Sequence, residues 1–134
     1  MAWRISFHAI GDDFSPAKMN FRFHEQNEKN EIHLIGIFKG EEYGYGSASY
    51  YVPEKIERLK KFKHLADTFE PLLDELKKCG AESWHIELER LYYAQCNEEL
   101  DFNEIVEIQR LKCSFCYSAY SVSENEEKEG FNQI

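Results

Sequence analysis

The sequence predicts an α+β domain with a mainly antiparallel sheet of about six strands, one long kinked helix and one short helix. Three observations support this prediction: several short segments alternate apolar and polar residues, a long middle segment repeats apolar residues at helical spacing, and a helix-capping motif follows later. The 134 residues fit a single domain, and an apolar fraction of 43% can form a core without a metal or disulfide.

Alternation of apolar and polar side chains predicts the strands. In residues 2–10, Trp3, Ile5 and Phe7 alternate with polar neighbours, which places one row of side chains on each face of a strand. Residues 32–38 carry apolar side chains on both faces, as expected for a central strand. The same reasoning predicts further strands at 19–24, 47–52, 84–88 and 113–122.

Two segments are predicted to be helical. Apolar residues recur at helical spacing through residues 56–76, where Pro71 removes one backbone donor and predicts a kink. A short helix is predicted after Asp101, because a glutamate three residues later completes the pattern of a capping box. We therefore expect one domain over residues 1–122, followed by a charged and flexible tail over residues 123–134.

Negative charge is concentrated in the last part of the chain. The formal net charge is −9, and residues 81–134 carry twelve acidic and four basic side chains. Such a balance repels nucleic acid and anionic membranes and favours a basic protein partner. Residues 55–63 are basic, but their acidic surroundings favour a solvated helix face over a nucleic-acid site. We expect the partner-binding surface to consist of seven acidic side chains within 21 residues: Glu87, Glu89, Glu98, Glu99, Asp101, Glu104 and Glu107.

The sequence contains no recognisable catalytic signature. Cys113 and Cys116 form a C-x-x-C, but residues three apart in a strand point to opposite faces, and no second ligand pair accompanies them. We therefore expect no metal, no cofactor and no enzymatic activity. The five histidines lack ligand spacing, and the sequence leaves open the strand registers that would bring four of them together on one sheet face: His8, His24, His33 and His85.

Three segments resemble a known bacterial family. They are FHAIGDDFSP (residues 7–16), the aromatic-rich YGYGSAS (residues 43–49) and LADTFEPLLDEL (residues 65–76). Together with the closing short helix and strand, they are similar to the bacterial domain-of-unknown-function family 4279, over residues 3–122. The resemblance implies a small cytosolic protein, because members look like such proteins and some resemble immunity proteins encoded beside secreted toxins. It implies no catalytic residues.

The expected function is that of a binding protein. The leading interpretation is a cytoplasmic immunity protein that neutralises a basic toxin domain, with a nuclease as the favoured class, by covering its active surface. The alternative is a non-catalytic interaction module that forms a homodimer through an exposed strand edge, and a small enzyme ranks third. The cytoplasmic location is expected because Arg4 and His8 interrupt the apolar start of the chain, unlike the start of a signal peptide.

Overall fold

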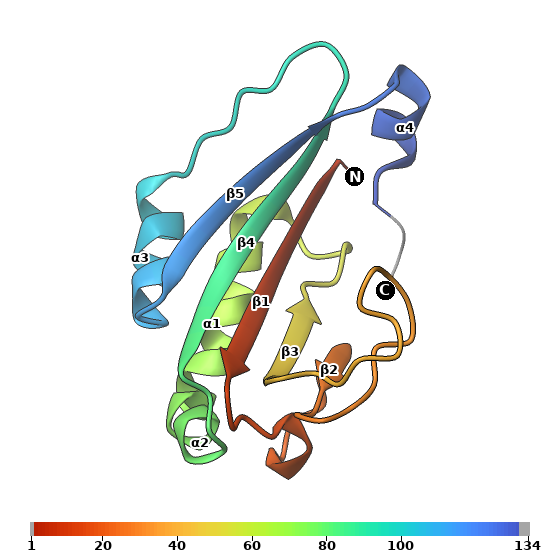
Figure 1. The fold of residues 1–134 in the computed structure, drawn as a ribbon. Helices are drawn as coiled ribbons and strands as arrows, with labels where there is room; N and C mark the ends of the chain where they lie inside the picture. The colour runs from red at the N-terminus through yellow and green to blue at the C-terminus, as the bar shows by residue number, and fades with distance from the viewer. Residues whose placement is uncertain (1, 132–134) are drawn as a thin grey trace.

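A five-stranded sheet with most of its helices on one face is the framework of the structure, a computed structural model that describes residues 2–131 (Figure 1). The strands are β1 (Trp3–Gly11), β2 (Glu25–Asn27), β3 (Gly46–Tyr51), β4 (Ser83–Tyr92) and β5 (Ser114–Ser121). The α-helices are α1 (Lys61–Phe69), α2 (Leu73–Lys78), α3 (Phe102–Arg110) and α4 (Glu124–Glu129). The 3₁₀ turns are η1 (Pro16–Lys18), η2 (Arg58–Lys60) and η3 (Glu70–Leu72).

The sheet has the order β2-β3-β1-β4-β5, with β1 at its centre. β1 pairs antiparallel with both β3 and β4, and β2 pairs antiparallel with β3. β5 is parallel to β4, because the chain crosses back through α3 before it enters the last strand. The predicted α+β class is confirmed, but the sheet is mixed and has five strands among the described residues.

Two predicted strands are absent. Residues 32–38 form the tip of a separate hairpin, in which the His33 amide donates to the Glu41 carbonyl (2.8 Å) and the Tyr43 amide to the Glu31 carbonyl (2.7 Å). We call residues 30–43 the apolar hairpin. Its backbone hydrogen bonds are made within the hairpin, while β3 and β4 occupy both sides of β1, so the sheet has no central position for this segment.

The second incorrect strand is residues 19–24. Met19 and Phe23 are buried in the core and Phe21 packs against it, so the apolar pattern of this segment reflects real burial. The backbone, however, joins the sheet only at the end of this segment, where the His24 amide donates to the Ser49 carbonyl (3.0 Å) and the short edge strand β2 begins. The alternation of apolar and polar residues therefore predicts which side chains of this segment are buried. It does not predict how the backbone is hydrogen-bonded.

The predicted helices are present, with one addition. Pro71 lies in η3, which joins α1 to α2 as the predicted kink. Asp101 caps α3 and forms the predicted capping box with Glu104. The segment expected to be a flexible tail contains α4, which begins with a second capping box at Ser123. Residues 132–134 of that segment lie outside the described residues.

Phe69 of α1 is the centre of the core. Its ring stacks on that of Phe7 in β1, with centroids 4.0 Å apart and an interplanar angle of 9°. Phe21 (5.1 Å), Tyr50 (5.3 Å) and Phe23 (6.0 Å) complete the cluster around it. This single side chain therefore connects the helix layer to the central strand and to the segment that precedes β2.

Removal of the Phe69 ring is expected to destabilise the whole domain. Phe69→Ala should lower the free energy of unfolding by about 3–5 kcal/mol, because it removes buried apolar surface and leaves a cavity. Chemical denaturation measures this change. Leu59→Ala, at a side chain 66% exposed in η2, is the control and should cost less than about 0.5 kcal/mol. A similar cost for the two variants would contradict the central position of Phe69.

Candidate functional site

The sheet face opposite α1 is polar. Strand alternation directs Ile5, Phe7 and Ala9 of β1 into the core, so the side chains between them lie on the other face. The register then pairs these residues with polar residues of β4: Arg4 with Glu89, Ser6 with Glu87, and His8 with His85. Ser49 and Tyr51 of β3 pair with His8 and Ser6. We call the surface that these residues form the polar sheet face.

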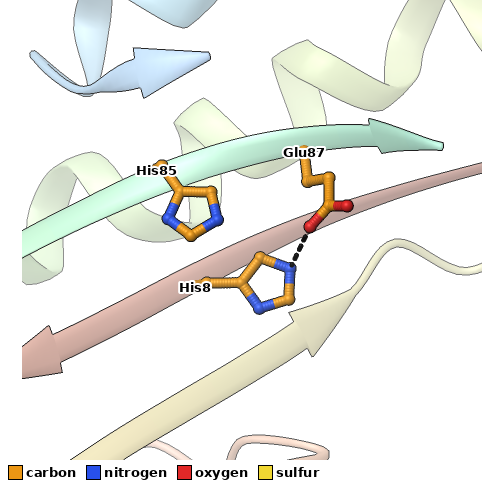
Figure 2. A group of neighbouring side chains, drawn as sticks. All are labelled: His8, His85 and Glu87. Atoms are coloured by element: carbon orange, nitrogen blue, oxygen red, sulfur yellow. Dashed lines mark ion pairs between the residues drawn. The ribbon is translucent and has the colours of Figure 1, made fainter. Parts of the chain in front are cut away.

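A cluster of His8, His85 and Glu87 occupies the middle of this face (Figure 2). The two imidazole rings stack with centroids 4.9 Å apart, and His8 Nε2 lies 3.6 Å from Glu87 Oε2. One possible metal-ligand atom of each residue, a ring nitrogen or a carboxylate oxygen, lies within 4.8 Å of those of the other two. We call this group the His8–His85–Glu87 cluster.

The strand registers, which the sequence leaves open, show which of the four histidines lie together. His8 and His85 are direct cross-strand partners. His24 is outside the cluster, because its Nδ1 accepts a hydrogen bond from the Tyr51 amide. His33 is also outside it, since its ring stacks on that of Tyr43 in the apolar hairpin, with centroids 3.6 Å apart.

His8 is held in the neutral form. Burial lowers its pKa to about 4, with further lowering from the neighbouring His85 and Arg4. Its ring nitrogens contact two hydroxyl groups, Ser6 Oγ at 2.8 Å from Nε2 and Ser49 Oγ at 2.7 Å from Nδ1. The approach of Glu87 to His8 is therefore a contact between a carboxylate and a neutral imidazole at pH 7, with a salt bridge forming only on protonation.

The lowered pKa of His8 predicts a loss of stability in acid. Between pH 6.5 and pH 4 the unfolded chain binds a proton at this residue that the folded protein does not, so the free energy of unfolding falls as the pH is lowered through this range. The full contribution is about 3 kcal/mol. Denaturation of the protein and of His8→Gln at pH 7 and pH 4.5 measures it. The variant should lose less stability, and parallel losses would contradict the prediction.

The seven acidic residues predicted to bind a partner do not form one solvated face. Glu87 and Glu89 lie on the polar sheet face, and Glu89 is only 7% exposed because it accepts hydrogen bonds from Arg4 Nε (2.9 Å) and Nη2 (3.1 Å). Glu107 pairs with Arg110 at 2.6 Å on α3. Glu99 is exposed in the loop before α3. The expected surface is thus divided between different parts of the molecule.

Glu98 and Glu104 belong to an internal ion-pair network. Glu98 accepts from Arg58 (3.1 Å), Arg90 (3.3 Å) and the Trp3 indole (2.8 Å). Glu104 is 2% exposed, pairs with Arg58, and also accepts from the Asp101 amide in the capping box. These carboxylates attach α3 and its preceding loop to η2 and β4. Glu98 and Glu104 are therefore paired inside the protein and are not free for a partner in this arrangement. A binding role for the acidic residues stays a prediction.

Glu104→Ala is expected to destabilise the protein strongly. The substitution leaves the Arg58 guanidinium partly unpaired in a buried setting, and loss of one partner of a buried ion pair costs about 3–5 kcal/mol. Glu99→Ala removes the same group from an exposed position and should change stability by less than about 0.5 kcal/mol. Thermal and chemical denaturation of the two variants provide the comparison. Equal stabilities would show that the network contributes nothing.

The two cysteines of the C-x-x-C have different surroundings. Cys113 packs against the core, and burial raises the pKa of its thiol to about 11. Cys116 lies on β5, is exposed, and pairs in register with Glu87 of β4.

The basic segment, residues 55–63, is partly buried and not fully solvated. Lys61 is 4% exposed, and its ammonium donates to the Pro53 carbonyl (3.0 Å).

Comparisons with protein-family models, curated proteins and solved structures found no match for this chain. Among residues 2–131, no helix has both the length and the hydropathy needed to cross a membrane. The functional interpretation of the candidate site consequently depends on the geometry of its residues alone.

Sequence reasoning missed two features. Glu87 was assigned to an acidic surface and not to a histidine cluster, although its place two residues after His85 puts both on one strand face. Residues 32–38, at the tip of the apolar hairpin, are predicted as a strand. The signal against that interpretation is Gly36, which lies inside this segment and takes a φ of +88° at the turn.

Proposed function

We propose that this chain is an immunity-type binding protein that neutralises a basic toxin domain, of nuclease class, by covering its active surface. The apolar hairpin is the contact that anchors the complex. The observation that carries this proposal is the exposure of its tip, where Leu34, Ile35 and Ile37 are 80%, 84% and 91% exposed.

An exposed apolar tip is costly to keep in water and is characteristic of a surface that binds another protein. Soluble proteins rarely leave a contiguous group of large apolar side chains uncovered unless a partner covers it. Ile32 and Phe38, at 56% and 53% exposed, extend the group on both sides of the turn. A few side chains packed at the centre of an interface supply most of its affinity, and we expect this apolar group to occupy that centre.

Charge complementarity favours a basic partner. The apolar tip is bordered by the exposed carboxylates of Glu31, Glu41 and Glu42, with Lys39 as the basic residue among them. The whole chain carries a net charge of −9. A nuclease must bind phosphates and therefore presents a basic active surface, which an acidic protein approaches quickly and selectively.

The test removes the apolar anchor without altering the sheet. We expect a reading frame beside this one to encode the toxin, and the absence of such a frame would count against the immunity function. The probe is that toxin domain, expressed with and without this protein. The double substitution Ile35→Asp and Ile37→Asp should abolish protection of growth and weaken binding at least tenfold, because it places charges in the centre of the interface. Isothermal titration calorimetry measures the binding of the purified pair.

Leu59→Asp is the matched control, because it introduces a charge at an exposed leucine far from the hairpin in sequence, within η2. This control should protect growth and bind as the unchanged protein does. Equal stability of all three proteins in chemical denaturation would show that the fold is intact. Full binding by the hairpin variant would overturn the anchor, and no binding by the unchanged protein would overturn the immunity function.

A homodimer through β5 is the second candidate. β5 pairs only with β4, so its other edge is unpaired among the described strands. Tyr117 and Tyr120 on this strand are 44% and 46% exposed. Sedimentation of the protein alone separates the candidates: a dimer that persists in the hairpin variant favours association through β5, and a monomer excludes it.

A further inference from the structure

The His8–His85–Glu87 cluster places two stacked imidazole rings and one carboxylate side by side on the polar sheet face (Figure 2). We propose that these three residues form a binding site for a divalent first-row transition metal, with Zn²⁺ as the ion that suits the ligand set. Two histidines and one glutamate are a known zinc ligand set, which leaves a fourth position open to solvent or to another molecule. The proposal reverses the sequence-based expectation of no metal and does not depend on the proposed partner.

The distances are close to those of a bound ion. Zinc bonds of about 2.0–2.2 Å to nitrogen and oxygen place neighbouring ligand atoms of a tetrahedron about 3.3–3.6 Å apart. His8 Nε2 and Glu87 Oε2 are already 3.6 Å apart, and one ligand atom of each of the three residues lies within 4.8 Å of the others. Because the two rings stack at an interplanar angle of 21°, one of them must rotate about its side-chain torsion angles for both to bind the same ion.

The strands hold the ligands at fixed positions. His8 and His85 are direct partners in the β1–β4 ladder, and Glu87 lies two residues further along the same face. Metal sites on paired strands need little backbone movement, because the ladder already sets the separation of the ligands. The site is therefore formed by the most regular part of the sheet.

A second layer of contacts prepares His8 as a ligand. Its Nδ1 lies 2.7 Å from Ser49 Oγ, so a proton on Nδ1 can be donated to this hydroxyl. The lone pair of Nε2 then accepts from Ser6 Oγ at 2.8 Å, and a bound ion would replace this hydrogen bond. The imidazole is neutral at pH 7, as a metal ligand must be. The adjacent Arg4 is paired with Glu89, which reduces the repulsion that its charge exerts on a cation.

The site is accessible from solvent. The side chains of His8 and Glu87 are 21% and 22% exposed, so each is anchored in the sheet but still reachable. Cys116 is exposed on β5 beside Glu87 and lies outside the group of atoms that meet at the cluster. The chelating set consequently consists of the three named residues, and the cysteine serves as a control.

The test is a titration of the chelator-treated, reduced protein with ZnCl₂. Isothermal titration calorimetry should show one ion bound per chain, and His85→Ala and Glu87→Gln should each weaken binding at least tenfold. His33→Ala, which removes a histidine from the apolar hairpin, should bind zinc as the unchanged protein does. Zinc should also raise the melting temperature of the unchanged protein and have a smaller effect on that of Glu87→Gln.

Two outcomes would overturn the proposal. One is zinc binding that survives His85→Ala and disappears in the double variant Cys113→Ser and Cys116→Ser, which would assign the ion to the thiols. The other is no binding by the unchanged protein at micromolar zinc. The absorption spectrum of the Co²⁺ complex gives a second readout, because thiolate ligands add an intense charge-transfer band that imidazole and carboxylate ligands lack. That band should be absent.

Discussion

The stacking of Phe69 on Phe7 sets the orientation of the central strand, and the rest of the structure follows from that orientation. Once Phe7 points into the helix layer, alternation directs Arg4, Ser6 and His8 to the opposite face of β1. β4 pairs with β1 in the register that its own buried residues require, which brings His85 beside His8. A hydrophobic contact on one face of the sheet thereby determines the polar cluster on the other.

Much of the fold could be predicted from the sequence, where one face of a segment is apolar and the other polar. β1, β3, β4 and β5 were predicted near their observed positions, as were the kinked helix and the capping box of α3. The prediction failed at residues 32–38, where apolar side chains on both faces are compatible with either a buried strand or an uncovered loop. Composition alone does not distinguish the two, because the difference lies in whether another part of the chain, or another molecule, covers the segment.

The candidate site was harder to predict than the fold, because its contacts join residues far apart in the chain. Glu104 belongs with the acidic segment in the sequence, yet its partner Arg58 is 46 residues away. The basic segment, residues 55–63, is likewise predicted to be solvated, although Arg58 pairs with Glu104 and Lys61 donates to the Pro53 carbonyl inside the protein. Opposite charges in separate segments can neutralise each other as easily as they attract a partner, and only the three-dimensional arrangement decides between these outcomes.

The two proposed sites depend on different properties of the fold. The apolar hairpin closes its own backbone hydrogen bonds, from the Asn30 amide to the Tyr43 carbonyl inwards, so its tip can adapt to a partner without altering a sheet register. The His8–His85–Glu87 cluster requires the opposite property, since its ligands keep their separation only while β1 and β4 stay in register. The connection between them is β3, which follows the hairpin and contributes Ser49 to His8. β3 is itself held along β1 from Gly46 to Tyr51, so a paired strand separates the adaptable hairpin from the fixed cluster.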